Sequence, residues 1–178
     1  MGDYELDILT KYGVEKYMYV PSVYGDSNFD FDKAGEGVKI ESGESDFFHS
    51  ITDRIVDFTK QKRAVIVFFR DKAAMDKYGS SPFFGKLGRN KLLLSEEMKP
   101  ADKDFAISKA ATAGQITLST AVFGRGTDFF CKDDRVTKNG GVHVIQAFLS
   151  EERSEEIQIQ GTCSQCSNHA YLLSLTTF

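Results

Sequence analysis

Short runs of apolar, strand-forming residues recur along most of this 178-residue chain, and segments with helical character separate them. The clearest is RAVIVFF, residues 63–69, which is too short for a typical helix and suits a strand buried on both faces. The pattern predicts further strands at residues 91–95, 115–120, 142–149 and 170–175. Because such alternation favours parallel pairing, we expect an α/β fold with a mainly parallel central sheet and helices on both faces.

Helical patterns fill the gaps between these predicted strands. Apolar residues recur at steps of three and four from Ser45 to Phe58, with Asp46 in the first turn, which predicts an amphipathic helix. Three further helices are expected, at residues 71–79 ending at Gly79, at residues 100–114 between Pro100 and Gly114, and at residues 150–161 with Ser150 as N-cap.

The first 44 residues differ in composition from the rest of the chain. Residues 25–46 are rich in Gly, Ser and Asp and predict a loop or an edge hairpin. We therefore divide the chain into a lead-in or interdomain connector with an acidic loop, residues 1–44, and one domain, residues 45–178. Residues 1–57 carry 13 acidic and 5 basic side chains, whereas residues 58–178 carry 13 acidic and 17 basic ones. This mildly basic body is compatible with an anionic ligand.

Bulk properties exclude several classes of protein. The net charge of −4 and the isoelectric point near 5.4 give no overall basic footprint for nucleic acid. Only three cysteines are present, which argues against a disulfide framework and for a cytoplasmic protein. No apolar run approaches the roughly 18 to 20 residues of a membrane helix, so no membrane span is expected.

The segment ITLSTAVFGRGTD, residues 116–128, places an arginine between two glycines just after a predicted buried strand. Ligands gather at the carboxyl ends of parallel strands, which makes Arg125 a candidate binding residue. Taken alone, these residues also fit a simple turn in which Asp128 pairs with Arg125 or caps the next element.

Two motifs follow at a fixed spacing, GGVHVI at residues 140–145 and a helix ending in IQIQG at residues 157–161. In this order the three motifs resemble the second motor domain of the SecA preprotein translocase ATPase. The resemblance covers about residues 45–161 and ends near residue 161, and EKYMYVPS, residues 15–22, resembles the connector from the preceding domain.

The resemblance implies a RecA-like three-layer domain of the helicase C-terminal type, in which two such domains clamp one ATP. Arg125 would be an arginine finger against the γ-phosphate. Gly124 and Gly126 would let the backbone approach the nucleotide, and Thr127 would belong to the same nucleotide-binding segment. Asp128 would hydrogen-bond the ribose or order the loop around the arginine.

The resemblance also implies shared ligands and partners. ATP and Mg²⁺ would be shared with a first RecA-like motor domain, in cis or in trans, and a polypeptide would be the transported substrate. Nucleic acid is not an expected partner.

Two departures from the family pattern lead us to expect no hydrolysis by the chain alone. The nearest candidate for a phosphate loop, GSSPFFGKL at residues 79–87, has the wrong glycine spacing and lacks the Ser or Thr after its lysine, so a loop is expected there. In the last motif, Gln158 and Gly161 fit, but Thr162 and Gln165 replace the two arginines. Either this paralogue has abandoned catalysis, or the sequence after Gly161 carries a reading-frame or splice error.

Three functions therefore stay open. The first is the nucleotide-sensing half of a SecA-like motor, of which this chain would be a fragment. The second is a non-catalytic RecA-like interaction or scaffold module, and the third is half of a nucleic-acid helicase.

The remaining candidate residues favour structural roles. Cys163, Cys166 and His169 could supply three zinc ligands, but no fourth is in view, so reduced thiols and no metal site are expected. His143 and His49 are expected to pack against apolar neighbours. The run SEERSEE, residues 150–156, is expected to be a solvated helix face with internal ion pairs.

Overall fold

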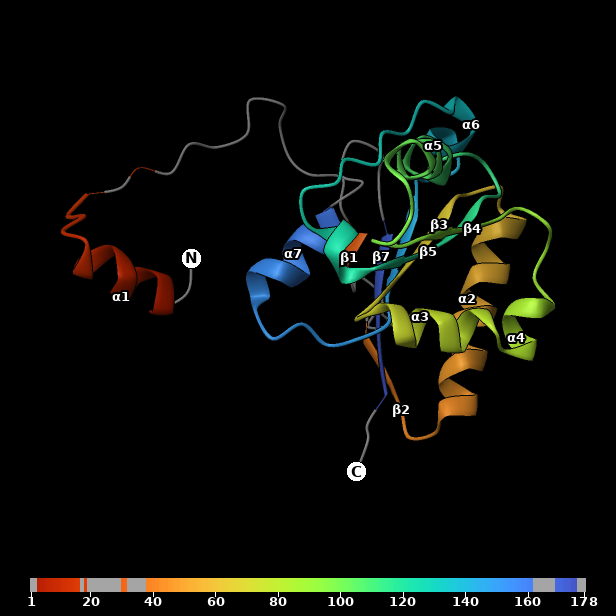
Figure 1. Ribbon diagram of the computed structural model, residues 1–178, viewed down its shortest axis with the longest axis horizontal. Coiled ribbons are helices and arrows are strands. Elements are labelled where there is room, and N and C mark those ends of the chain that lie inside the picture. Colours follow the sequence, from red (N-terminus) through yellow and green to blue (C-terminus); the bar gives the residue numbers. More distant parts are fainter. Residues whose placement is uncertain (1–2, 17, 19–29, 32–37, 162–168, 176–178) are drawn as a thin grey trace.

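The computed structural model describes residues 3–16, 18, 30–31, 38–161 and 169–175 (Figure 1). Its seven-stranded sheet has the order β1-β7-β6-β3-β5-β4, with β2 also paired to β7. Each of these strand pairs is parallel. The strands are β1 (Asp30–Phe31), β2 (Val38–Glu41), β3 (Val65–Phe69), β4 (Lys91–Leu94), β5 (Ile116–Thr120), β6 (His143–Gln146) and β7 (His169–Leu175). The helices are α1 (Asp3–Lys11), α2 (Glu44–Lys60), α3 (Lys72–Gly79), α4 (Pro82–Gly85), α5 (Pro100–Ala110), the 3₁₀ helix η1 (Ala121–Gly124), α6 (Asp134–Lys138) and α7 (Arg153–Gly161).

Strand β3 lies between β5 and β6, and all five of its residues are buried. Successive side chains of a strand point to opposite faces of the sheet. Val65, Val67 and Phe69 accordingly enter one hydrophobic core, while Ile66 and Phe68 enter a second core on the other face. The predicted three-layer α/β architecture is therefore confirmed.

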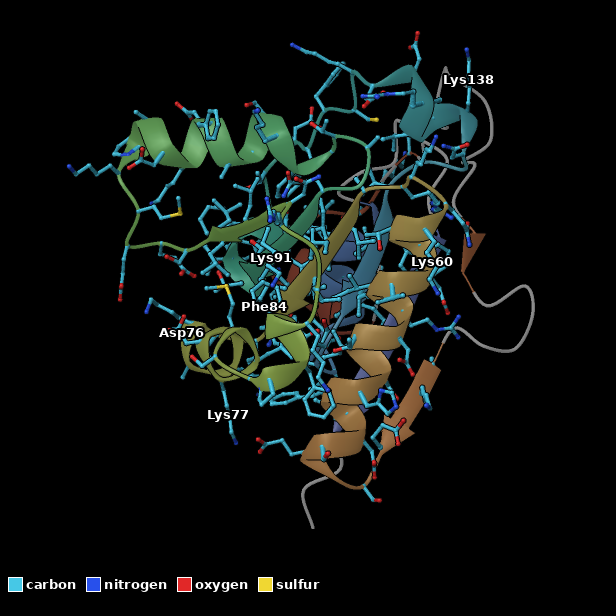
Figure 2. All side chains as sticks on the ribbon, turned by 90° about the vertical axis from the view of Figure 1, so that its right-hand side faces the viewer. Lys60, Asp76, Lys77, Phe84, Lys91 and Lys138 are labelled. Carbon is cyan, nitrogen blue, oxygen red and sulfur yellow. The ribbon has the colours of Figure 1, made fainter. Side chains whose placement is uncertain are left out.

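The first core lies under α2, α3 and α4. Tyr78 of α3 is fully buried there, and its hydroxyl lies 2.9 Å from the Thr52 hydroxyl of α2. Burial raises the pKa of Tyr78 to about 12. At the edge of this core, the Lys91 ammonium of β4 lies 4.5 Å from the centre of the Phe84 ring and donates to the Phe84 carbonyl (Figure 2).

The second core lies under α5, η1, α6 and α7. Each of these elements contributes at least one buried apolar side chain, among them Phe123 of η1, Val136 of α6 and Ile159 of α7. Helices α2 and α7 consequently lie on opposite sides of the sheet, while α1 lies away from it (Figure 1).

The structure corrects several predicted boundaries. The last helix begins at Arg153 and not at Ser150, because the Ser150 hydroxyl instead accepts a hydrogen bond from the Gln146 side-chain amide at 2.8 Å. The predicted loop at residues 79–87 contains α4, and its Phe84 and Leu87 side chains belong to the first core. Helices α1 and α6 were not predicted from the sequence pattern.

The predicted edge hairpin within residues 25–46 is wrong for the residues described. Strands β1 and β2 both pair in parallel with β7, which follows them by more than a hundred residues, and not with each other. Part of the lead-in therefore joins the central sheet, and the division at residue 44 stays a prediction.

The glycines of GGVHVI lie at the amino end of β6, opposite the end where Arg125 is found. Gly140 and Gly141 have φ angles of +96° and +81°, which favour glycine. The buried Arg63 side chain donates to the Gly141 carbonyl at 2.8 Å and lies 4.8 Å from the centre of the Phe58 ring. These glycines thus have a structural role, in which they let the chain turn closely around a buried guanidinium.

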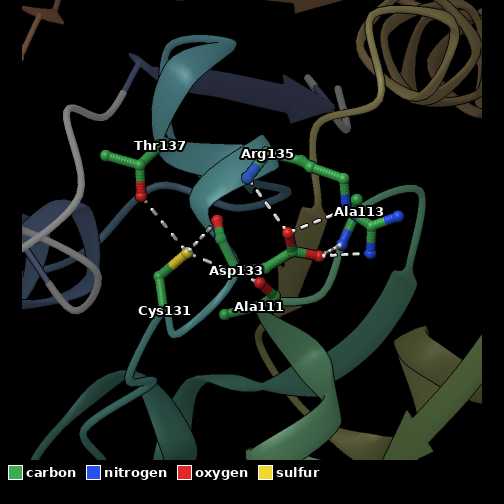
Figure 3. Close-up of polar contacts among 6 residues, drawn as sticks. All are labelled: Ala111, Ala113, Cys131, Asp133, Arg135 and Thr137. Atoms are coloured by element: carbon green, nitrogen blue, oxygen red, sulfur yellow. Dashed lines mark hydrogen bonds and ion pairs between the residues drawn. The ribbon is translucent and has the colours of Figure 1, made fainter.

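A second polar cluster fastens the chain segment that returns from β5 to β6 (Figure 3). The Asp133 carboxylate accepts hydrogen bonds from the Ala113 amide at 3.1 Å and from the Arg135 guanidinium at 2.9 Å. It also caps α6. The bonds from the Arg135 side chain, followed by the one from the Ala113 backbone, hold the pKa of Asp133 well below its usual range.

We expect Asp133→Asn to destabilise the protein at neutral pH, because the neutral amide cannot replace the charge-assisted bonds to Arg135. A carboxylate whose pKa is depressed by folding stabilises the folded state above its unfolded pKa of about 4, and this contribution is lost as the pH falls toward the folded value. The difference in free energy of unfolding between wild type and Asp133→Asn should therefore be smaller in acid than at neutral pH. Urea unfolding of both proteins at neutral pH and at about pH 3 measures this difference.

The control is Asp134→Asn, which removes the neighbouring exposed carboxylate and the same charge. It should change stability less than Asp133→Asn at neutral pH. A difference between wild type and Asp133→Asn that stays constant across this pH range would contradict the assignment.

Candidate functional site

The sheet has a switch point between β3 and β5. After β3 the chain enters α3, whose Met75 and Tyr78 belong to the first core, whereas after β5 it enters η1 and α6, which pack in the second core. Neighbouring parallel strands whose following helices cover opposite faces leave a crevice at their carboxyl ends, where ligands bind in open α/β sheets. The residues that follow β3 and β5 are therefore the first candidates for a binding site.

The segment after β5 turns sharply before it reaches Arg125. Thr120, the last residue of β5, is buried and donates its hydroxyl hydrogen to the Glu96 carboxylate at 2.5 Å. Phe123 anchors η1 in the second core, and the Arg125 amide donates to the Val122 carbonyl at 3.4 Å. Gly126 follows with a φ of +77°, so the chain turns away directly after the arginine.

Gly124 is buried against α7. A Cβ atom at this position would lie 2.5 Å from Cγ1 of the fully buried Ile159. Only glycine therefore lets η1 and α7 approach this closely, and the position of α7 depends on it.

Helix α7 supplies a partner for the arginine. The Arg125 Nε atom donates to the Gln158 side-chain oxygen at 3.3 Å, and its Nη2 atom lies 3.9 Å from the Glu152 carboxylate. The Arg125 side chain keeps 50% of its surface exposed. The structure thus brings together two of the predicted site residues, Arg125 and Gln158, while Gly161 ends the same helix.

Thr127 is half-buried and Asp128 is exposed. Among the described residues, Asp128 forms neither a hydrogen bond nor an ion pair with Arg125. The simple turn closed by an Arg125–Asp128 pair is therefore not what the structure adopts.

Arg70 follows β3 directly and was missed at the level of the sequence. Its Nη2 atom donates to the Leu149 carbonyl at 3.1 Å, and its Nη1 atom lies 3.7 Å from the Glu151 carboxylate. No motif marks this residue. Its position in the sequence could have indicated a binding role, because Arg70 is the first polar residue after a buried parallel strand.

The acidic run at residues 150–156 was predicted to be a solvated helix face with internal ion pairs, and the structure corrects this prediction. Its Glu151 and Glu152 precede α7, and they pair with Arg70 and Arg125 from other parts of the chain. These carboxylates are part of the site.

The histidines at positions 143 and 49 lie outside this site. His143 is buried and its ring stacks on Phe58 at 3.6 Å between centroids, as predicted for a packed core histidine. His49 is exposed, with its ring 6.1 Å from that of Phe83 and its Nδ1 atom 3.2 Å from the Asp53 carboxylate, so the prediction of packing holds only in part.

Cys163 and Cys166 lie outside the described residues, and no group of three or more possible metal ligands occurs within the described ranges. No helix in the described part of the chain is long and apolar enough to cross a membrane.

We expect Gly124→Ala to destabilise the protein by about 1–3 kcal/mol, since the added methyl group overpacks the contact with Ile159. Gly88→Ala is the matched control, because a Cβ there meets no atom within 4 Å. Combining Gly124→Ala with Ile159→Ala should cost less than the sum of the two single changes, as expected for coupled neighbours. Additive losses in urea unfolding would contradict the contact.

No protein-family model matches this chain. A curated relative, the protein translocase subunit SecA of Syntrophus aciditrophicus (strain SB), is 28% identical over 119 residues, which cover 66% of this chain and 14% of the relative. Among solved structures, the C-terminal part of the Fun30 ATPase domain superposes with a TM-score of 0.53 at 15% identity, covering 99% of this chain and 51% of that one. The chain thus spans about one seventh of that SecA and about half of the Fun30 structure.

The sequence match confirms the likeness to SecA that the motifs predicted, and the structural match confirms the fold. Together the two comparisons support a likeness of this chain to part of SecA and a RecA-like ATPase-domain fold.

Proposed function

We propose that this domain is the nucleotide-sensing half of a SecA-like ATPase motor and that Arg125 is its arginine finger. The observation that supports this most directly is the place of Arg125, which lies at the switch point with half of its guanidinium side chain exposed. Gln158 orients the group from α7 without neutralising its charge. A planar cation held in this way suits bidentate contact with a phosphate group.

The described residues fit one half of an ATP site. They offer the half-exposed guanidinium of Arg125. From the likeness to SecA, we propose that a first motor domain facing this edge supplies the phosphate loop and the ligands of Mg²⁺. When bound, MgATP supplies the phosphoryl group whose transfer develops charge on the γ-phosphate oxygens.

The residues of this chain would each have a limited task. Arg125 would donate hydrogen bonds to the γ-phosphate oxygens. Gly126, with its left-handed backbone, would turn the chain away from Arg125 so that the following residues do not cover the guanidinium group. The exposed Asp128 would hydrogen-bond the ribose, with Thr127 beside it. Gly124 would act indirectly, by setting the position of α7 and hence of Gln158.

The role proposed for the whole protein rests on its relative. The SecA match is named a protein translocase subunit, so we propose ATP-dependent movement of a polypeptide. The small number of cysteines is the basis for proposing a cytoplasmic location. An interaction or scaffold module and half of a nucleic-acid helicase are the alternatives that the following experiment separates from this proposal.

We predict that the isolated chain binds ATP weakly and that the first motor domain of a SecA protein, added in trans, restores ATP turnover. Arg125→Ala should lower this turnover by about 10³-fold, since an arginine finger contributes about that much. Steady-state phosphate release from the mixture measures the effect. The matched control is Arg89→Ala, which removes an exposed arginine away from the switch point and should leave turnover unchanged.

Turnover that survives Arg125→Ala would exclude the arginine finger. Absence of turnover with any homologous first domain would favour the interaction module. A salt-dependent shift of single-stranded DNA or RNA by the wild-type chain would instead favour a helicase half.

A further inference from the structure

Two arginines, and not one, face the switch point. Phe69 and Thr120 are paired residues at the ends of β3 and β5, and the two strands lie about 4.8 Å apart. Arg70 follows the first strand at once, and Arg125 follows the second after the single turn of η1. Both side chains keep about half of their surface exposed, 56% for Arg70 and 50% for Arg125.

One acidic dipeptide contacts both guanidinium groups. Glu151 lies 3.7 Å from Arg70 and Glu152 lies 3.9 Å from Arg125, each measured between nitrogen and oxygen. Consecutive Cα atoms are about 3.8 Å apart, so the two arginines reach toward the same short stretch of chain. Arg70 also holds this stretch through its hydrogen bond to the Leu149 carbonyl.

These two ion pairs are weak. Both distances are near the upper limit for an ion pair, and the carboxylates are exposed, 85% for Glu151 and 67% for Glu152. Exposed pairs of this kind contribute little to stability. A phosphate group, with more charge and with oxygens that accept two parallel hydrogen bonds from a guanidinium, can displace them.

We propose that Arg70 and Arg125 form a single site for a phosphate chain and that Glu151 and Glu152 occupy it as an internal competitor until the chain enters. The inference rests on the proposed function in taking a nucleotide as the source of that phosphate chain. Arg70 is then a second phosphate-binding residue, and the loop between β6 and α7 sets the affinity. Entry of the ligand breaks both ion pairs between this loop and the arginines.

Binding to the full chain at fixed low salt tests the site, with inorganic tripolyphosphate and ATP as the two probes and titration calorimetry as the measurement. Glu151→Gln combined with Glu152→Gln should tighten binding of tripolyphosphate about tenfold, because the competitor is lost while the arginines stay. Arg70→Ala should weaken binding of tripolyphosphate to this double variant about tenfold or more. Arg70→Lys should recover part of it, since lysine keeps the charge without the planar fork.

The matched control for net charge is Asp102→Asn combined with Asp104→Asn, which removes two exposed carboxylates from α5. This control should tighten binding less than twofold. If both double variants increase the affinity for tripolyphosphate equally, Glu151 and Glu152 do not act as a competitor. If Arg70→Ala leaves this affinity unchanged, Arg70 does not bind the phosphate chain. Circular dichroism melting of each variant identifies a loss caused by unfolding.

The two probes separate the sources of the ligand. If the variants change the affinities for ATP and for tripolyphosphate in parallel, the site recognises the phosphate chain alone. If they change only the affinity for ATP, the site recognises a nucleotide. Failure of this inference is distinct from failure of the proposed function. ATP turnover with a first motor domain could require Arg125 while the affinity for tripolyphosphate is unchanged by substitution of Arg70, Glu151 and Glu152. That result would exclude this inference and leave the arginine finger supported.

Discussion

The complete burial of β3 is the constraint on which the rest of the structure depends. Neighbouring side chains of this strand enter two different cores, so helices must cover both faces of the sheet. The chain leaves β3 toward the first core and leaves β5 toward the second, and this divergence creates the crevice at the carboxyl edge. Arg70 and Arg125 lie at this crevice because each follows one of the two diverging strands.

Burial separates the roles of three arginines in this small domain. Arg63 is buried at the amino edge, where its guanidinium contacts the Gly141 carbonyl and the Phe58 ring, and burial lowers its pKa to about 10. It remains charged at neutral pH and fastens the turn before β6. Arg70 and Arg125 are half exposed, and within the described part of the chain their ion pairs are with exposed carboxylates, so their charge stays available to a ligand.

The fold could be predicted from the sequence because its central strands are encoded locally. The apolar run that forms β3 is continuous, and β5 and β6 are short buried segments that contain strand-forming residues. Parallel pairing of these strands follows from the helices between them. The features of the fold that were not predicted depend on contacts between residues far apart in the sequence or on side-chain hydrogen bonds. The pairing of β1 and β2 with β7 has no local signal, and the late start of α7 follows from the capture of Ser150 by Gln146.

The candidate site was predictable only in part for the same reason. Arg125 stands in a recognisable motif, and Gly126 has the positive φ that a glycine after it allows. The close approach of Gly124 to Ile159 and the pairing of Glu151 with Arg70 join residues that lie far apart in the chain. Arg70 belongs to no motif, so only the strand topology brings it to the site.

The most direct measurement is a structure of this chain bound to a SecA first motor domain, MgADP and a planar mimic of the transferring phosphoryl group. We predict that Arg125 leaves Glu152 and donates to the mimic at about 2.7–2.9 Å, the distance of a charge-assisted hydrogen bond. A closed complex in which Arg125 still contacts Glu152 and Gln158, with the mimic bound by the first domain alone, would contradict the arginine finger.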